Sequence, residues 1–317
     1  MKHPIICVVG PTASGKTKLS IELAKQYNGE ILSCDSMQIY RGMTIGTAKP
    51  TAEEMEGIPH HMIDVADPGE AFSVGRYVEM ADPILQDILS RGKTCVIVGG
   101  TGLYVDSLIA GRSFMPYPET GKRQALEAIV EAQGIGVVLN LLWTVDPDSA
   151  ERLHPSDQRR IIRAAEVYLE TGKTITQHNR ETQAIPPKYQ PLWLGLDFTD
   201  RAELYARIDK RVDLMMEQGL IEEIQGLLAA GTPPTATSLQ AIGYKEPMAA
   251  LRGEITMAEA VDKIKQESRR YAKRQLTWFR RNKDIHWICN KEPVLFEAVW
   301  EQVEVIIDNC GVACGDD

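Results

Sequence analysis

A glycine-rich segment near the N-terminus, GPTASGKT at residues 10–17, constrains the fold more than any other stretch of this 317-residue chain. It satisfies the pattern G-x-x-x-x-G-K-[ST]. It stands between an apolar, β-rich run that stops at Gly10 and an amphipathic pattern in KLSIELAKQY. A strand, this loop and a helix in that order form a phosphate-binding unit, because glycine lets backbone N–H groups crowd around phosphate oxygens at the helix N-terminus. The sequence therefore predicts a phosphate site, of a kind that usually holds ATP or GTP.

Two side chains in this loop bring specific chemistry. Lys16 supplies a full positive charge to the terminal phosphates, and the Thr17 hydroxyl is a ligand of the type that holds Mg²⁺ beside them. The other residues contribute mainly backbone groups. We therefore predict phosphate contacts along the whole loop, at Gly10, Pro11, Thr12, Ala13, Ser14, Gly15, Lys16 and Thr17.

Strand-like and helix-like segments alternate over the first hundred residues. GEILSCD is typical of a second strand and HHMIDV of a short third one, and a helix over residues 74–91 precedes the buried strand TCVIVGG. Strand, helix and strand at this spacing predict a parallel sheet with helices on its faces. Later in the chain, PLWLGLDF is typical of a return to the sheet, and the residues from 201 onward have mainly helical patterns.

A change of pattern begins where Pro116 and Pro118 punctuate the chain. Helical patterns such as KRQALEAIVEAQG and QRRIIRAAEVYLETG follow, and AIPPKYQP closes the stretch. We predict an α/β core made of residues 1–115 and 190–317, with C-terminal helices. A helical insertion at residues 116–189 interrupts this core.

Polar side chains follow two of the predicted strands. Asp35 ends the second strand, and Thr101 follows the buried strand in GGTGLY. Ligands of open α/β sheets bind at the carboxyl ends of the strands, so both residues are candidates for a site. Asp35 could hold Mg²⁺ or act as a general base, or it could merely cap the following turn. The glycines around Thr101 either admit a ligand or serve a plain strand-to-helix turn.

Other residues of metal-binding type have weaker patterns. Asp64 is a second, weakly supported carboxylate for the magnesium side, whereas His60 and His61 have no metal-like partner spacing and are interpreted as structural. Cys310 and Cys314 form a lone pair without a second pair or histidines at zinc-finger spacing. We therefore expect no structural zinc.

The remaining cysteines and the apolar pattern indicate the compartment. Cys7 and Cys95 sit inside apolar runs and are typical of reduced core residues. No stretch approaches the roughly 20 uninterrupted apolar residues of a membrane span, and the N-terminal apolar run is too short for a signal peptide. We expect a cytoplasmic protein with no membrane partner.

A basic stripe stands out in a protein whose net charge is −9. Residues 263–283, KIKQESRRYAKRQLTWFRRNK, hold nine Lys or Arg and one acidic residue, with Tyr271, Trp278 and Phe279 interleaved. Cations reach phosphates and aromatic faces can stack on bases, so the stripe favours nucleic acid over a merely solvated helix whose aromatic residues face the core. Arg159, Arg160 and Arg163 add a smaller patch within the insertion.

Seven segments in this order carry a family resemblance: GPTASGKT, SCDSMQIYRGMTIGTAKP, PHHMIDV, VGGTGLY, HPSDQRRIIRAAE, QAIGYKE and KRQLTWFR. Together they closely resemble the bacterial tRNA dimethylallyltransferases, also called tRNA isopentenylpyrophosphate transferases, from the first strand to about Trp287. DSMQIYRGMTIGTAKP and KRQLTWFR are the specific segments, because ordinary nucleotide kinases lack them.

The resemblance implies a fold and an activity. The fold is a P-loop NTPase-like α/β core with a helical insertion that grips the tRNA anticodon stem-loop. The loop holds the diphosphate of dimethylallyl diphosphate rather than ATP. The five-carbon group passes to the exocyclic N6 amine of the adenosine just 3′ of the anticodon, with Mg²⁺ as cofactor. We expect the enzyme to act as a monomer.

The resemblance also implies roles for residues. Asp35 corresponds to the general base, Thr101 to a contact with the reacting end of the RNA, and Arg211 to an arginine that steadies the diphosphate; from its position, Asp35 is also a second candidate magnesium ligand beside Thr17. The implied tRNA contacts are Asp35, Ser36, Met37 and Gln38; Arg159, Arg160, Ile161, Ile162 and Arg163; Gln240, Ala241, Ile242, Gly243, Tyr244 and Lys245; and Lys273, Arg274, Gln275, Leu276, Thr277, Trp278, Phe279 and Arg280.

Three other functions compete with this one. A P-loop kinase of a small molecule would bind ATP, with the insertion arginines as a mobile lid. A nucleotide-gated RNA-binding protein would need the stripe but not Asp35. A prenyltransferase of free adenine nucleotide would keep the chemistry and drop the RNA. The stripe at residues 263–283 is unexplained by the first and the third.

Overall fold

The computed structural model describes residues 5–112, 120–183 and 185–310, and the chain divides into two compact units. One unit comprises Met1–Gly111 with Lys188–Asp317, and the other is Arg112–Pro187. The change of pattern expected at Pro116 and Pro118 lies outside the described residues, as does Cys314. Each unit has a hydrophobic core of its own.

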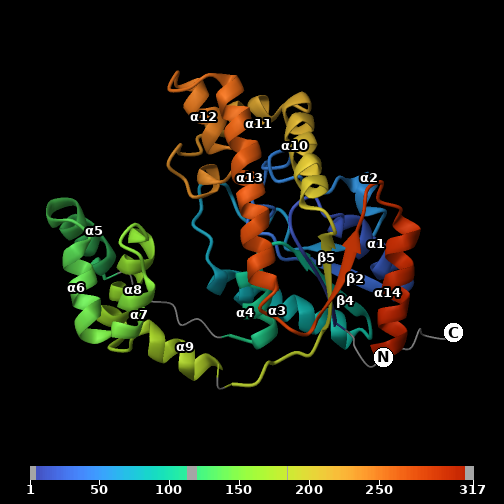
Figure 1. Ribbon diagram of the computed structural model, residues 1–317, viewed down its shortest axis with the longest axis horizontal. Coiled ribbons are helices and arrows are strands. Elements are labelled where there is room, and N and C mark those ends of the chain that lie inside the picture. The colour runs from blue at the N-terminus through green and yellow to red at the C-terminus, as the bar shows by residue number, and fades with distance from the viewer. Residues whose placement is uncertain (1–4, 113–119, 184, 311–317) are drawn as a thin grey trace. The chain divides into compact units, whose positions relative to one another are not determined.

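A six-stranded parallel sheet organises the larger unit (Figure 1). Its strands, in the order β3-β2-β4-β1-β5-β6, are β1 (Ile5–Val9), β2 (Gly29–Ser33), β3 (His60–His61), β4 (Thr94–Gly99), β5 (Leu192–Phe198) and β6 (Ile285–Asn290). Every neighbouring pair is parallel, and β1, β2 and β5 are buried along their whole length, as expected when helices cover both faces. The predicted α/β fold with a parallel sheet is confirmed.

Helices cover the two faces of this sheet. Helices α1 (Lys16–Gln26) and α14 (Phe296–Cys310) pack with one face through residues such as Leu23 and Val303. Helices α3 (Val74–Ser90) and α4 (Gly102–Ala110) pack with the other through residues such as Tyr77 and Leu108. Among the described helices none is long and apolar enough to cross a membrane. The double cover leaves the carboxyl ends of the central strands as the open edge.

Two edge strands differ from the expectations. HHMIDV forms only the two-residue β3, because Met62 and Asp64 adopt left-handed backbone angles (φ 62° and 54°) that turn the chain out of the sheet. Strand β6 pairs with β5 in a region predicted as mainly helical, so the prediction missed it. The β-branched and aromatic run IHWIC at residues 285–289 was the signal for it, and Ile285 and Ile288 pack on opposite faces of the sheet.

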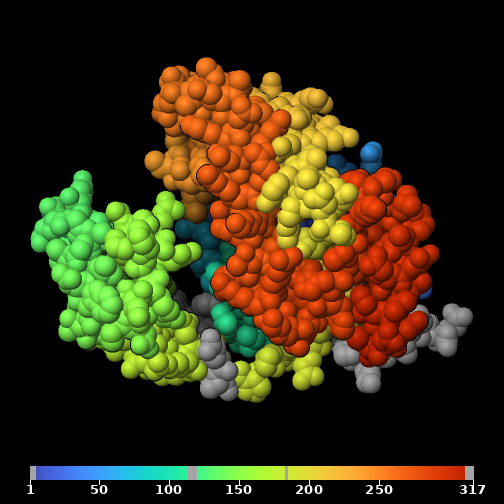
Figure 2. Space-filling view, viewed as in Figure 1, coloured from blue at the N-terminus to red at the C-terminus, as the bar shows by residue number. Residues whose placement is uncertain are grey.

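A second group of helices in this unit packs beside the sheet. They are α10 (Arg201–Glu217), α11 (Leu220–Ala229), α12 (Lys245–Leu251) and α13 (Met257–Phe279), with the short α2 (Ala52–Met55) and a 3₁₀ turn at Ser238–Gln240. Figure 2 shows α13, in orange, lying against α10, in yellow. Helix α13 begins at a capping box, in which Thr256 and Glu259 satisfy each other's backbone N–H groups. The helix has 23 residues and contains the basic stripe from residue 263 to residue 279.

The smaller unit is entirely helical in its described part. Its helices are α5 (Lys122–Gln133), α6 (Gly136–Val145), α7 (Pro147–Arg152), α8 (Gln158–Thr171) and α9 (Ile175–Gln183). Leu126, Leu142 and Ile161 are buried in its core. Buried Asp146 joins α7 to α9, since it accepts hydrogen bonds from Ser149 and Thr176. Although burial alone would raise it, these hydrogen bonds hold the pKa of Asp146 below its usual value.

Candidate functional site

The glycine-rich loop leaves β1 at Val9 and enters α1 at Lys16. Gly10 and Gly15 have positive φ angles, and a Cβ on Gly10 would meet the Leu196 carbonyl oxygen at 2.5 Å. Helix α1 has no side-chain cap and no acidic residue in its first turn. Its first N–H groups and the positive end of the helix dipole therefore suit an anion. The loop has the backbone shape that the sequence predicted for a phosphate site.

The side chain of Lys16 folds back onto its own loop. Its Nζ donates to the Pro11 carbonyl at 2.6 Å. Burial, and to a smaller extent nearby Arg211, lower the pKa of Lys16 to about 7, while Asp35 acts in the opposite direction. A phosphate oxygen could replace the carbonyl as the partner of this ammonium group. An anionic ligand beside Lys16 would therefore favour its protonated, positively charged form.

Two arginines of α10 reach the same loop. Arg211 Nη1 lies 3.4 Å from the Thr12 hydroxyl. Burial lowers the pKa of the Arg211 guanidinium, whereas the negative charge of Asp35 raises it. Arg207, one turn earlier, donates to the Ala13 carbonyl at 3.0 Å and pairs with Glu292 at 2.7 Å. Arg211 was expected here from the family resemblance, whereas Arg207 was not. The i, i+4 spacing in RIDKR, which places both on one helix face, was the signal for it.

Asp35 lies just beyond β2, with half of its carboxylate engaged. Its Oδ1 accepts hydrogen bonds from the N–H groups of Met37 (2.8 Å) and Gln38 (3.3 Å), so the capping role is real. No described residue donates to Oδ2. Since Asp35 shifts the pKa values of both Lys16 and Arg211, it lies within electrostatic reach of the phosphate loop. One carboxylate can thus serve both as a cap and as a base.

Thr101 follows β4 and meets the segment after β2. Its hydroxyl accepts from the Ser36 N–H at 3.1 Å and donates to the Ser36 hydroxyl at 3.2 Å, and its own N–H donates to the Cys34 carbonyl. The structure therefore brings the predicted residues Asp35 and Thr101 to one edge of the sheet. That edge also holds the phosphate loop, because β1, β2 and β4 are parallel neighbours.

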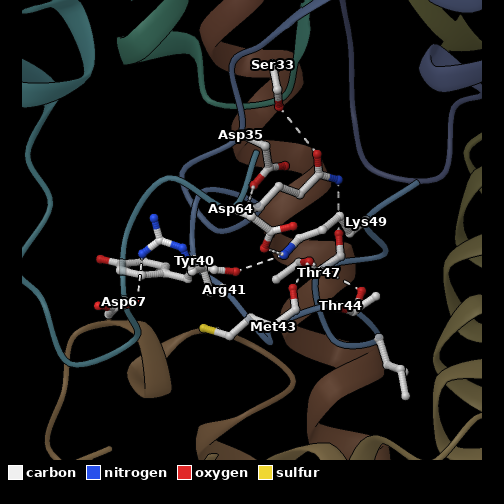
Figure 3. A network of polar contacts seen from close by, with 12 residues as sticks. Ser33, Asp35, Tyr40, Arg41, Met43, Thr44, Thr47, Lys49, Asp64 and Asp67 are labelled. Carbon is white, nitrogen blue, oxygen red and sulfur yellow. Dashed lines mark hydrogen bonds and ion pairs between the residues drawn. The ribbon is translucent and has the colours of Figure 1, made fainter. Parts of the chain in front are cut away.

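The loop after Asp35 is fixed from inside by Lys49 (Figure 3). Lys49 is 7% exposed, and its Nζ donates to the Tyr40 carbonyl at 2.8 Å and to Asp64 Oδ1 at 2.5 Å. Gln38 crosses the same loop and donates to the carbonyls of Thr47 and Ala48. Asp64 is therefore engaged with Lys49, which gives no support to its expected place on the magnesium side.

Glu223 of α11 fixes this loop from outside. Its carboxylate accepts from the backbone N–H groups of Thr44, Ile45 and Gly46 at 2.8, 2.7 and 3.2 Å, and from the Tyr244 hydroxyl at 2.7 Å. Tyr244 is fully buried, and its ring fills the space where a side chain on Gly46 would lie. Of the predicted RNA-contacting segment 240–245, Gln240 and Lys245 are exposed.

The stripe on α13 divides into paired and unpaired cations. Ion pairs join Lys265 to Asp213 and Arg269 to Asp209, which ties α13 to α10; Arg270 and Arg280 are also paired, with Glu267 and Asp197. No ion pair within the described part of the chain involves the exposed Lys273 and Arg274. Free positive charge therefore concentrates near the last turns of the helix.

The aromatic residues of the stripe mostly face inward. Phe279 is fully buried in the core, and the Trp278 indole N–H donates to Asp106 of α4 at 2.8 Å. Burial, together with the negative charge of Asp35, raises the pKa of Tyr271 to about 12. Gln275 and Leu276 are buried as well. Within the predicted segment 273–280, the exposed residues are Lys273, Arg274, Thr277 and Arg280.

The basic patch of the smaller unit surrounds a cavity of about 450 Å³. Arg159, Arg160 and Arg163 line it together with Arg123 and Arg152, while Leu153, Ala164 and Ile175 add apolar surface. Ile161 and Ile162, between the arginines, are buried in the core of the unit. The segment 159–163 thus offers arginines to a partner and isoleucines to its own helix packing.

Comparisons with known proteins point in one direction. Residues 38–282 match the family model described as IPP transferase, and residues 3–66 match the one described as isopentenyl transferase. The tRNA dimethylallyltransferase of Acetivibrio thermocellus is 47% identical over 309 residues, covering 97% of this chain and 98% of that one. The one from Thermoanaerobacter sp. strain X514 is 47% identical over 289 residues, covering 90% and 92%.

Solved structures give the same likeness. The tRNA isopentenylpyrophosphate transferase of Bacillus halodurans superposes with a TM-score of 0.71 at 43% identity, covering 97% of this chain and 95% of that chain. A eukaryotic dimethylallyltransferase, captured acting on tRNA, superposes with a TM-score of 0.81 at 32% identity, covering 97% and 79%.

Proposed function

Because the chain belongs to the tRNA dimethylallyltransferase family, we propose that its glycine-rich loop holds the diphosphate of dimethylallyl diphosphate. The enzyme is a prenyltransferase that transfers the dimethylallyl group to a tRNA adenosine. In our proposal the acceptor is the N6 amine of the adenosine 3′ to the anticodon, and diphosphate is released. One observation supports our assignment of the site most strongly. Lys16, Arg207 and Arg211 surround the loop at the same sheet edge as Asp35.

In our proposal Asp35 is the general base. The adenosine N6 attacks C1 of the dimethylallyl group, a C–N bond forms, and the C–O bond to the diphosphate breaks. An aryl amine is a weak nucleophile, so the reaction gains from a carboxylate that accepts the N6 proton as positive charge develops on nitrogen. Oδ2 of Asp35 can take this proton, while Oδ1 stays bonded to the following turn. Thr101, bonded to Ser36 beside it, would contact the reacting end of the RNA.

Fixed positive charges would stabilise the leaving diphosphate. Negative charge grows on its bridging oxygen as the C–O bond breaks, and preorganised donors lower the energy of that state. Lys16, Arg211 and the loop N–H groups supply them, and Arg207 holds the loop itself by donating to Ala13. The same charges hold the donor in the ground state, so part of their effect appears in its affinity.

Magnesium fits the donor set of this edge. The exposed Thr17 hydroxyl and the Asp35 carboxylate are hard oxygen ligands, which Mg²⁺ prefers. Among the described residues, no group of three acidic, histidine or cysteine side chains is placed to bind a metal, so further ligands would come from the substrate. We propose that Thr17 and the diphosphate oxygens hold Mg²⁺, with Asp35 as a second candidate ligand. When bound, Mg²⁺ would neutralise charge on the diphosphate.

The tRNA would be held at several surfaces. We propose that the exposed members of segments 35–38, 240–245 and 273–280 contact it on the larger unit, and that Arg159, Arg160 and Arg163 of the insertion contact the anticodon stem-loop. Extruding the target adenosine costs a few kcal/mol of unstacking, which phosphate contacts can offset. We further propose that the enzyme acts as a monomer, in the cytoplasm where its tRNA substrate is.

A single reaction tests the proposed function. Purified protein and Mg²⁺ are mixed with unmodified tRNA bearing adenosine 3′ to the anticodon, and either dimethylallyl diphosphate or ATP is added. Mass spectrometry of the digested nucleosides should find a dimethylallyl adduct on adenosine with the prenyl donor only. ATP turnover without an adduct would support a kinase, and tRNA binding without an adduct would support a non-catalytic RNA-binding protein. Free AMP as an equally good acceptor would remove the tRNA from the proposal.

A further inference from the structure

Helix α13 contacts both active-site loops with one row of side chains. Tyr271, Gln275 and Trp278 stand at i, i+4 and i+7, so they share a face of the helix. The Thr101 side chain lies close enough to Tyr271 to lower its pKa, against the larger effect of burial, and Trp278 donates to Asp106 of α4. Over about two turns, therefore, the helix that carries the basic stripe lies directly on the segment that follows β4.

Gln275, the middle residue of this row, also reaches the phosphate loop. It is 6% exposed. Its Oε1 accepts the Thr12 N–H at 2.9 Å, and its Nε2 donates to the Gly100 carbonyl at 3.0 Å. One buried carboxamide thus spans the gap between the loop proposed to bind diphosphate and the segment that contains Thr101. The contact needs both an acceptor and a donor on this side chain, because one loop presents an N–H group and the other a carbonyl oxygen.

The glycines of GGTGLY make room for this helix. A Cβ on Gly100 would lie well under 3.0 Å from Gln275 Nε2, and one on Gly102 equally close to the Trp278 ring. Neither glycine has a positive φ, so the turn itself does not require them. These two positions therefore serve the close approach of α13.

The neighbouring face of the same helix turns is exposed and basic. Lys273 and Arg274 directly precede Gln275 in sequence, and both are exposed to solvent. A polyanion bound there would restrain the helix turn from which Gln275 projects. Because Gln275 is bonded to the Thr12 N–H, restraining that turn also restrains the phosphate loop.

We propose that Gln275 is a positioning residue that couples tRNA bound on α13 to diphosphate bound at the glycine-rich loop. The inference rests on the proposed function and adds to it an energetic link between the two substrates. Whichever substrate binds first bears the cost of fixing the shared carboxamide, and the second finds its site already shaped. Such coupling is reciprocal, so each ligand should tighten the binding of the other by the same factor.

The coupling factor is measured with inorganic pyrophosphate as the probe. Calorimetry with Mg²⁺ gives the pyrophosphate affinity of the full-length protein, with and without saturating unmodified tRNA. For the wild-type protein we expect tRNA to tighten pyrophosphate binding at least about fivefold, the low end of typical coupling between sites. In Gln275→Met, which conserves volume but can bond neither Thr12 nor Gly100, the ratio should fall to about one. The affinity of this variant for tRNA alone should stay within about twofold.

A second variant covers the case in which Gln275→Met fails to fold. Gln275→Glu has the same shape and keeps an acceptor for Thr12, but it cannot donate to Gly100. Its negative charge weakens pyrophosphate binding in both conditions, whereas the ratio of the two affinities reports only the coupling. This ratio should also decrease. Gln302→Met, on the exposed face of α14, is the matched control and should leave the ratio unchanged.

Two results would overturn the inference: a ratio near one in the wild-type protein, or wild-type ratios in both Gln275 variants. These failures differ from failure of the proposed function. A wild-type enzyme that transfers the dimethylallyl group but shows unchanged coupling in the variants contradicts the role of Gln275 alone. A wild-type enzyme that forms no adduct contradicts the function itself.

Discussion

Asp35 illustrates how one carboxylate can meet two demands at the scale of a residue. One oxygen holds the turn that begins the loop, and the other faces no described donor. Position at the end of a strand indicated both roles without separating them. The structure shows that they are compatible, because each needs only one oxygen.

Asp35→Asn separates the two roles experimentally. The asparagine Oδ1 can still accept from Met37 and Gln38, but its amide cannot take a proton from the N6 amine. We expect the transfer rate to fall about 10²- to 10⁴-fold, the usual contribution of a general base, while tRNA affinity changes little. Single-turnover kinetics and filter binding measure the two quantities. Asp308→Asn, at an exposed position of α14, is the control, and a rate near that of the wild type in Asp35→Asn would contradict the assignment.

Lys16 gives the site a specific pH dependence. With its pKa at about 7 in the ligand-free protein, Lys16 is charged below pH 7 and increasingly neutral above it. Bound pyrophosphate favours the charged form and raises this pKa, so binding above pH 7 takes up a proton and weakens as the pH rises. Lys16→Arg stays charged throughout. Calorimetry in buffers of different ionisation enthalpy measures the number of protons taken up on pyrophosphate binding. Subtracting the Lys16→Arg value from the wild-type value removes the protons bound by pyrophosphate itself, and we expect extra proton uptake by the wild type alone.

At the scale of an element, α13 carries exposed basic residues on one face and contacts the glycine-rich loop with another. The sequence pattern identified its charge but could not tell which of its residues face inward, because basic and buried residues alternate within one turn. Lys265 and Arg269 turned out to be paired with α10, whereas Lys273 and Arg274 are not paired within the described chain. Charge reversal should therefore have different effects along the same helix.

Reversing the unpaired cations tests this division. Lys273→Glu with Arg274→Glu should weaken tRNA binding and make its salt dependence shallower, by roughly 0.7–0.9 in the log–log slope for each lost phosphate contact. Arg269→Ala should instead lower the free energy of unfolding, because it leaves Asp209 without its partner, and keep the salt slope. Titrations of tRNA at several salt concentrations measure the slopes. Equal slopes in all proteins would make the stripe purely structural.

Gly102 tests the packing of the same helix on α4. The Cβ of Gly102→Ala would displace the Trp278 ring and disturb its hydrogen bond to Asp106. We expect a loss of about 1–3 kcal/mol in the free energy of unfolding, as for other overpacked cores. Gly226→Ala, in the interior of α11 with nothing nearby, should instead stabilise by up to about 1 kcal/mol. Urea denaturation measures both, and a neutral Gly102→Ala would show that Trp278 has room to move.

At the scale of the whole molecule, local patterns predicted more than distant contacts did. The loop, its flanking strand and helix, and the parallel sheet follow from segments of ten to twenty residues, and all are present. The short β3 and the missed β6 depend on left-handed residues and on pairing with a distant strand, which local periodicity does not contain. In the site, Arg211 came from the family resemblance, whereas Gln275 was assigned to RNA contact and lies buried between two loops.

The core should tolerate removal of the insertion. The chain leaves the core at Gly111 and returns at Lys188, whose side chain packs on Gly111, and the Tyr189 N–H donates to the Ile109 carbonyl. Replacing residues 112–187 with a short Gly/Ser linker should give a protein that unfolds cooperatively and still binds pyrophosphate. Its tRNA affinity should fall at least about tenfold, or 1.4 kcal/mol. Full tRNA affinity in this variant would exclude the insertion from RNA binding.

The hydrogen bond between Thr12 and Gln275 has a consequence for folding during synthesis on the ribosome. These residues are 263 positions apart in the chain. At 5–20 residues per second, a ribosome adds Gln275 roughly 13 to 53 s after Thr12. During that interval the nascent chain carries a complete glycine-rich loop without the carboxamide that holds it. On our proposal for Gln275, a growing polypeptide acquires a competent substrate site only near the end of its synthesis.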